Sequence, residues 1–197
     1  MSKLPHYFIA IPLPDLLKDY FSSWQNDLQQ KLSYKEWPHQ QDLHITLKFL
    51  GPVDSEALLQ LQAELKEIEQ LEVFSLNVGT IGTFGNPRQP RVVWAGVEKT
   101  NQLTILQQRV EECAARIGFA KENREYRPHI TLAKKWTGDN GIEGMAEIRK
   151  EYREMQNMEV NEVIIYQVFP NRKPRYEVVQ TYQLGKECFT PISKNMV

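Results

Sequence analysis

This sequence has few cysteines, no long apolar run and almost no excess of positive or negative charge. Its 197 residues include two cysteines, Cys113 and Cys188, which do not have the spacing of metal ligands. We therefore expect neither a structural disulfide nor a zinc site. No apolar run is long enough to cross a bilayer, and no charged-then-apolar leader opens the chain. The expectation is a soluble, cytoplasmic protein that does not enter a membrane.

The charges nearly cancel, since 24 lysines and arginines stand against 25 acidic residues and the formal net charge is −1. Broad binding to nucleic acid normally needs a basic surface, so any contact with nucleic acid is expected to be local. Residues 172–175, Arg-Lys-Pro-Arg, form the one concentrated basic run, and a charged turn at a hairpin tip is its more common explanation. Nothing in the sequence indicates a protein partner, and we expect a monomer.

The sequence does contain a tetrapeptide that occurs twice. His-Ile-Thr-Leu stands at residues 44–47 and again at residues 129–132, an offset of 85 residues. Each copy lies in a run that alternates polar and apolar residues, which is typical of a strand with one buried face. The histidine and threonine of each copy therefore share a face, and Lys48 and Arg127 are in phase with them. A lone strand histidine is more often structural than catalytic, but a matched pair indicates an acid and a base.

The repetition extends beyond the tetrapeptide and indicates an internal duplication over about residues 6–82 and 91–169. Each copy predicts, in order, an apolar strand, a helix, the histidine strand, a second helix and a closing strand. The expected helices cover residues 14–32, 54–69, 101–117 and 142–152, and the expected closing strands cover residues 73–81 and 160–169. A last strand at 175–184 is expected to form a hairpin with the strand before it, and residues 186–197 are expected to form a flexible tail.

Two such copies predict an α+β fold of two lobes related by a pseudo-twofold axis. Each lobe is expected to be an antiparallel sheet whose outer face is covered by its own helices. The Gly/Pro-rich segment 82–91 is the expected boundary between the copies, and residues 1–185 are expected to form one bilobal domain. If the uncovered faces of the sheets meet, the two His-x-Thr pairs lie opposite each other across a groove.

The segments around the two motifs carry a resemblance to a known family. The first copy continues as His-Ile-Thr-Leu-Lys-Phe-Leu-Gly, and the second reads Arg-Pro-His-Ile-Thr-Leu-Ala. Arg-Val-Val-Trp-Ala-Gly-Val lies between them, and Pro-Arg-Tyr-Glu-Val lies near the end. Over about residues 6 to 185, the sequence resembles the two-histidine phosphoesterase superfamily. Within it, the sequence is similar to the RNA 2′,3′-cyclic phosphodiesterases, once described as 2′-5′ RNA ligases.

The resemblance implies a reaction and two catalytic roles. The reaction is hydrolysis of a 2′,3′-cyclic phosphate at an RNA end to a 2′-phosphomonoester, with no metal and no cofactor, in the groove between the lobes. His44 is implied to be the proton donor to the leaving 3′-oxygen, and His129 to be the base that activates water. The cyclic phosphate end of an RNA or oligonucleotide is the implied substrate.

The chemistry of a cyclic phosphodiester supports the same residues independently. Water must lose a proton as it attacks phosphorus and the leaving oxygen must gain one, and histidine is the only side chain whose ordinary pKa suits both steps near pH 7. The hydroxyls of Thr46 and Thr131 are suited to donating hydrogen bonds to the nonbridging phosphate oxygens, although threonine is also an ordinary strand residue. Arg127 can add positive charge to the same face.

Several residues keep alternative interpretations. Lys48 is equally consistent with a place in the groove and with an exposed strand end. Tyr176 is either a core residue or a ring that stacks on a nucleobase, and the same two interpretations hold for Tyr7, Phe8, Trp94 and Tyr166. His6 and His39 have no partner motif and no adjacent carboxylates, so they are expected to be surface or packing residues rather than ligands of a metallophosphoesterase.

Two other functions remain open. The first is a noncatalytic module that recognises RNA ends or small nucleotides in the same groove, which the intact His44 and His129 disfavour. The second is a 2′-5′ RNA ligase in which synthesis is the biological direction. The sequence contains no Gly-x-x-x-x-Gly-Lys-Ser/Thr loop for a nucleoside triphosphate, so net synthesis has no evident energy source.

Overall fold

The structure is a computed structural model that describes residues 4–138, 142 and 144–186. Its helices are α1 (Asp15–Lys31), α2 (Ser55–Glu64), α3 (Asn101–Arg116) and α4 (Met145–Glu151), and its 3₁₀ turns are η1 (Gln40–Asp42) and η2 (Leu65–Gln70). Its strands are β1 (His6–Pro12), β2 (Tyr34–Glu36), β3 (His44–Pro52), β4 (Phe74–Gly85), β5 (Pro90–Val97), β6 (His129–Trp136), β7 (Met155–Val160), β8 (Glu162–Val168) and β9 (Tyr176–Gln183). The expected tail beyond Lys186, including Cys188, lies outside the described residues.

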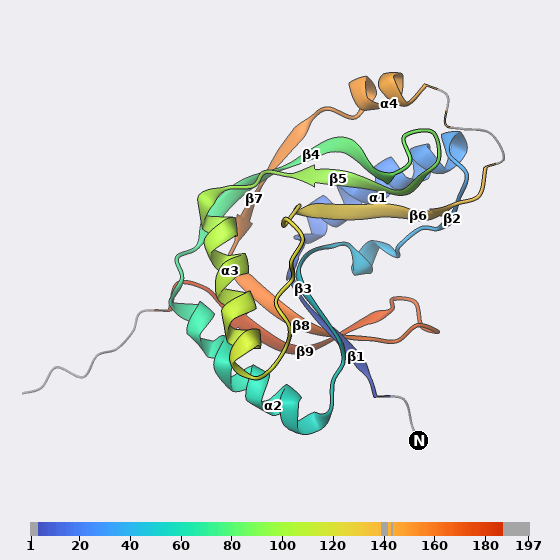
Figure 1. The fold of residues 1–197 in the computed structure, drawn as a ribbon. Helices are drawn as coiled ribbons and strands as arrows, with labels where there is room; N and C mark the ends of the chain where they lie inside the picture. Colours follow the sequence, from blue (N-terminus) through green and yellow to red (C-terminus); the bar gives the residue numbers. More distant parts are fainter. Residues whose placement is uncertain (1–3, 139–141, 143, 187–197) are drawn as a thin grey trace, which may run out of the picture.

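All strands of the described chain belong to one antiparallel sheet of nine strands, in the order β7-β4-β5-β6-β3-β1-β8-β9, with β2 paired to β6. Strands β3 and β6 join its two halves through a single registered pair, Ile45 with Ile130. The two groups of strands diverge from this joint, so the sheet is strongly bent (Figure 1). The α+β class and the antiparallel strands are confirmed, whereas two separate sheets are not found.

The two copies of the repeat exchange strands and helices. Strand β4 of the first copy pairs with β5 and β7 of the second, and β8 of the second copy pairs with β1 of the first. Helix α1 packs against β6, where Gln25 Nε2 donates a hydrogen bond to the carbonyl oxygen of Leu132 (2.9 Å), and α3 packs against β3 (Figure 1). The expectation that each lobe is covered by its own helices is therefore wrong.

The place of β4 follows from the segment between the copies. Residues 82–91 were expected to link two lobes, but they belong mostly to the ends of β4 and β5, which form a hairpin. Antiparallel strands joined by a short turn stay adjacent, so β4 remains beside the strands of the second copy.

Local sequence signals determine where the long helices begin. Thr100 is the N-cap of α3, because its Oγ1 accepts a hydrogen bond from the N–H of Leu103 (3.1 Å). Asp54 caps α2 in the same way through the N–H of Ala57 (2.9 Å). The helices expected at 14–32 and 101–117 are confirmed as α1 and α3.

Other expected elements differ in their bounds. The helix expected at 54–69 is α2 followed by the 3₁₀ turn η2, and the helix expected at 142–152 shortens to α4. The strand expected at 160–169 is divided at Asn161 into the end of β7 and all of β8, while the last strand at 175–184 is confirmed as β9. Strand β2 is too short to have a clear alternating pattern, and the sequence did not predict it.

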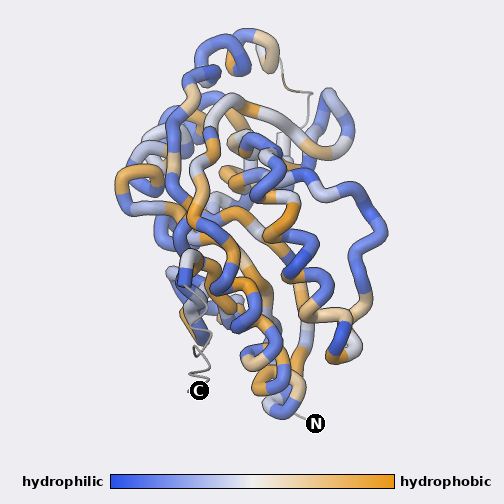
Figure 2. Tube along the Cα trace, turned by 90° about the vertical axis from the view of Figure 1, so that its left-hand side faces the viewer, coloured by the Kyte–Doolittle hydropathy of each residue, from blue (hydrophilic) through white to orange (hydrophobic). Residues whose placement is uncertain are grey.

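The core lies where the long helices cover the sheet. Ile45 and Ile130 of the joint are fully buried there, together with Phe21 of α1 and Leu103 of α3. Hydrophobic and hydrophilic residues alternate along the helices in Figure 2, as expected when only one side of each helix faces the core. Among the described residues, no helix combines the length and the apolar character needed to span a bilayer.

Candidate functional site

The joint between β3 and β6 places the two His-x-Thr motifs side by side. The antiparallel pairing of Ile45 with Ile130 brings His44 across from Thr131 and Thr46 across from His129. Side chains alternate along a strand, so the two isoleucines point to the helices while the four motif side chains point to the opposite face, where they are half-buried. The motifs therefore share one face of one sheet, and the expectation of two opposing sheets is wrong.

The same backbone contact holds both imidazoles. Nδ1 of His44 lies 2.7 Å from the carbonyl oxygen of Asp42, and Nδ1 of His129 lies 2.8 Å from the carbonyl oxygen of Arg127. A carbonyl oxygen can only accept, so Nδ1 carries the hydrogen and Nε2 of the neutral ring is left to act as an acceptor. Nε2 of His44 lies 3.0 Å from Oγ1 of Thr46, which donates to it in this tautomer. The Nδ1 contact with the carbonyl two residues earlier thus recurs at both histidines.

Aromatic rings surround each imidazole. The His44 ring centroid lies 4.7 Å from that of Phe8 and 5.3 Å from that of Tyr176. The His129 ring meets Phe84 edge-on, with centroids 4.9 Å apart. Tyr176 is half-buried beside His44, so it lies at the site as the sequence suggested. Phe8, which the sequence left with the same two interpretations as Tyr176, also lies beside His44. The sequence gave no signal for Phe84.

These surroundings lower the pKa of both histidines. Burial is the main cause at each ring, and it lowers the pKa of His44 from 6.5 to about 4 although the contact with the Asp42 carbonyl acts in the opposite direction. The ammonium of Lys134 also lowers both values, and His129 adds to the effect on His44. Both rings are therefore mainly neutral at pH 7 in the free protein. A bound anion would raise both pKa values, because a nearby negative charge favours the imidazolium.

Lys134 is a cation of the site that the sequence interpretation missed. It is half-buried, and burial lowers its pKa. In the part of the chain that the structure describes, its ammonium has no hydrogen-bond or ion-pair partner. Strict alternation along β6 from His129 would place Ala133 and Lys135 on the face of the histidine. A register shift in the β5–β6 pairing, between Val93 and Trp94, changes this alternation, so that Lys134 lies near the imidazoles instead.

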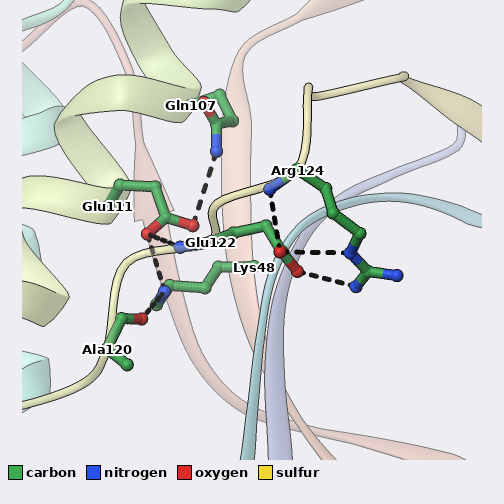
Figure 3. Close-up of polar contacts among 6 residues, drawn as sticks. All are labelled: Lys48, Gln107, Glu111, Ala120, Glu122 and Arg124. Carbon is green, nitrogen blue, oxygen red and sulfur yellow. Dashed lines mark hydrogen bonds and ion pairs between the residues drawn. The ribbon is translucent and has the colours of Figure 1, made fainter.

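A similar shift removes Lys48 from the site. The β1–β3 register changes between Ile9 and Ala10, and the side chain of Lys48 is only 4% exposed while Phe49 is 74% exposed. Nζ of Lys48 lies 2.7 Å from Oε2 of Glu111 on α3 (Figure 3). The expectation that Lys48 shares the face of His44 is therefore wrong, and its buried ammonium faces α3 instead.

The buried Lys48–Glu111 pair fastens the segment that leads to His129. Lys48 Nζ also donates to the carbonyl oxygen of Ala120 (2.9 Å), and Glu111 Oε2 accepts from the N–H of Glu122 (3.3 Å), as Figure 3 shows. A few residues later, the hydroxyl of Tyr126 donates to the carbonyl oxygen of Thr46 (3.1 Å). Residues 118–128 are thereby tied to α3 and to the first motif strand.

Two cavities flank the histidines. The first, of about 540 Å³, borders the aromatic neighbours of His129 and is lined in part by Phe84, Trp94 and Arg127. The Arg127 side chain is 70% exposed and lies 3.6 Å from Glu125, so its guanidinium is at the cavity rim rather than packed against the imidazole. The second cavity, of about 410 Å³, lies at the turn between β8 and β9 and includes Tyr176 in its lining.

Comparison with known proteins identifies the family of this chain. Residues 13–168 match the model of the 2′-5′ RNA ligase superfamily. The chain belongs to this superfamily. The resemblance that the sequence indicated is thereby confirmed.

Individual relatives cover nearly the whole chain. It is 35% identical to the RNA 2′,3′-cyclic phosphodiesterase of Bacillus subtilis (strain 168), over 92% of this chain and 97% of the relative. It is 32% identical to the protein of the same name from Methanocaldococcus jannaschii, over 89% of this chain and 98% of the relative. Among solved structures, E. coli LigT complexed with 3′-AMP is similar, with a TM-score of 0.73 and 25% identity over 92% of this chain and 99% of LigT.

Metal ligands do not gather in the described structure. Across residues 4–138, 142 and 144–186, no three His, Cys, Asp or Glu side chains form a group that could hold a metal ion. Metal-free chemistry at this site stays a prediction.

We expect Lys48→Met to lower the free energy of unfolding by about 3–5 kcal/mol, because it leaves the Glu111 carboxylate buried without its partner. The double variant Lys48→Met/Glu111→Gln should recover part of this loss, since the amide oxygen still accepts from Glu122. Urea unfolding at pH 7 measures both values.

Lys31→Met provides the matched control. It breaks an ion pair with Glu151 whose side chains are 38% and 54% exposed, so the loss should stay below about 1 kcal/mol. Equal losses in Lys48→Met and Lys31→Met would contradict the importance of the buried pair.

Proposed function

We propose that this protein hydrolyses the 2′,3′-cyclic phosphate ends of RNA to 2′-phosphomonoesters by paired-histidine acid–base catalysis. The observation that carries the proposal is the pairing of two His-x-Thr motifs on one sheet face, with each imidazole fixed through Nδ1. The relatives named RNA 2′,3′-cyclic phosphodiesterases support the substrate class. The proposed substrate-bound unit is a monomer without a cofactor.

The proposed reaction is an in-line displacement at phosphorus. The cyclic phosphate lies between the two Nε2 atoms, with water on the His129 side and the 3′-oxygen on the His44 side. His129 accepts a proton from the attacking water, and a new P–O bond forms while the P–O3′ bond breaks. His44 gives its proton to the departing 3′-oxygen, so the phosphate remains on the 2′-oxygen.

The threonines can change partners during this reaction. In the free protein, the Thr46 hydroxyl donates to Nε2 of neutral His44. When His44 becomes protonated, Nε2 no longer accepts, and the hydroxyl hydrogen is free to turn to a nonbridging phosphate oxygen. Thr131 takes the equivalent role beside the other histidine by the symmetry of the joint.

Charge near the phosphate comes from Lys134 and Arg127. The half-buried ammonium of Lys134 already influences both imidazoles, so it is positioned to stabilise a bound anion. Arg127 at the cavity rim is proposed to reach the phosphate once the substrate is bound. The ring of Tyr176 is proposed to contact the sugar or base on the His44 side.

The deciding experiment incubates the purified protein with an RNA oligonucleotide that ends in a 2′,3′-cyclic phosphate, with and without excess EDTA. We expect a 2′-phosphomonoester that resists enzymes specific for 3′-phosphates, and equal turnover in EDTA. A 3′-phosphate product would show that the leaving group, and hence the role of His44, is misassigned. Activity lost in EDTA and restored by zinc would overturn the metal-free mechanism, and binding without turnover would favour the noncatalytic module.

His44→Ala and His129→Ala should each lower kcat by about 10²- to 10⁴-fold while KM changes little, because each removes one proton transfer. In a concerted displacement both groups serve one transition state, so the double variant should lose far less than the product of the single losses. Thr46→Val and Thr131→Val should each lower kcat by about 10- to 10³-fold. Near-normal turnover in either folded histidine variant, with folding checked by circular dichroism, would refute the paired mechanism.

The pH dependence should differ between kcat/KM and kcat. The active form has one protonated and one neutral imidazole, and both pKa values are lowered in the free protein. The profile of kcat/KM, which reports the free enzyme, should therefore have its maximum below pH 6.5. The bound anion raises both pKa values, so the maximum of kcat should lie at higher pH. Initial rates with 2′,3′-cyclic AMP test this, and coincident maxima above pH 7 would contradict it.

A further inference from the structure

We propose that the turn between β8 and β9 binds the nucleotide that precedes the cyclic end of an RNA strand. The hairpin-tip pocket is defined here by Phe169, Arg172, Lys173, Pro174, Tyr176 and Glu177, which line the cavity of about 410 Å³. This inference rests on the proposed function and specifies its substrate as a strand of at least two nucleotides.

The hairpin-tip pocket adjoins the His44 side of the site. Tyr176 lines this pocket, and its ring centroid also lies 5.3 Å from the imidazole of His44 and 4.7 Å from the ring of Phe8. One side chain therefore borders both the reacting end and the pocket. A molecule that extends from His44 past Tyr176 enters the pocket directly.

The direction of the proposed reaction sends the RNA strand to this side. In-line attack places the entering water and the leaving 3′-oxygen on opposite sides of phosphorus. Water is activated at His129, so the ribose that carries the 3′-oxygen lies toward His44. The same ribose is linked through its 5′-oxygen to the rest of the strand, which therefore leaves the site on the side of Tyr176.

The chemistry of the hairpin-tip pocket fits a nucleotide. The guanidinium carbon of Arg172 lies 3.9 Å from the ring centroid of Phe169, an arrangement that offers flat surfaces for a stacked base. Arg172 also pairs with Glu177 at 2.8 Å, and both side chains are about 60% exposed, at 59% and 61%. An ion pair with this degree of exposure is weak, so a phosphate can replace the Glu177 carboxylate as the partner of Arg172.

Positive charge is concentrated at this turn. Lys173 is exposed, and within the described chain its ammonium has no ion-pair partner. Arg175 adds a second cation nearby, 3.9 Å from Glu36. In a protein whose formal net charge is −1, this local excess is suited to one or two backbone phosphates rather than to a long nucleic acid.

The test compares two substrates, 2′,3′-cyclic AMP and a trinucleotide that ends in a 2′,3′-cyclic phosphate. Arg172→Ala/Lys173→Ala should lower kcat/KM for the trinucleotide about 10-fold and leave kcat/KM for 2′,3′-cyclic AMP unchanged. The fall in kcat/KM should come mainly from a higher KM, because Arg172 and Lys173 of the hairpin-tip pocket make no contact with the reacting atoms. The double variant should also show a weaker fall of trinucleotide kcat/KM with added salt, since fewer phosphate contacts are made.

Lys150→Ala/Arg153→Ala removes the same charge from exposed positions after the start of α4 and serves as the matched control. It should leave both substrates unaffected. The inference is overturned if the tip variant hydrolyses the trinucleotide normally, if both substrates lose rate equally, or if the control variant shows the same selective loss. Wild-type protein that hydrolyses neither substrate would instead overturn the proposed function, and the inference with it.

Discussion

The pairing of Ile45 with Ile130 is the contact on which the rest of the site depends. It joins the two halves of the sheet and sets the register in which both His-x-Thr motifs meet. Both isoleucines are fully buried against the helices, which leaves the opposite face to the four polar side chains. A slip of one residue in either strand would turn its histidine toward the core. The hydrophobic core and the reactive face are therefore specified by the same register.

The exchange of elements between the two copies makes the site a property of the whole domain. Strand β4 completes the half of the sheet that holds His129, and β8 completes the half that holds His44. Hydrogen bonds also connect the two copies, from Gln25 to the backbone of β6 and from Tyr126 to the backbone of Thr46. Each histidine also has a neighbour from outside its own copy, Tyr176 for His44 and Phe84 for His129. The two copies are therefore not independent folding units.

The electrostatics of the free site favour an anionic ligand. Burial and the ammonium of Lys134 lower the pKa of His44 and His129, so the free protein holds two mainly neutral rings beside a lysine that has no partner in the described chain. In the proposed reaction, a phosphodiester supplies the missing negative charge and thereby promotes the protonation that general acid catalysis requires. Binding and activation of the acid are then linked by one physical effect.

The sequence by itself determined the α+β class, the long helices and the shared face of histidine and threonine, because these follow from local periodicity and from an exact repeat. Only the tertiary structure decided which residues next to the motifs belong to the site. Lys48 and Lys134 each lie within a few residues of a motif, yet register shifts in the neighbouring strand pairs send Lys48 to Glu111 and bring Lys134 to the imidazoles. Such a register shift depends on the pairing of two strands that are far apart in the sequence, so the alternation of residues within one strand cannot reveal it. The exchange of β4 and β8 was hidden for the same reason, since strand pairing is a contact between segments far apart in the chain.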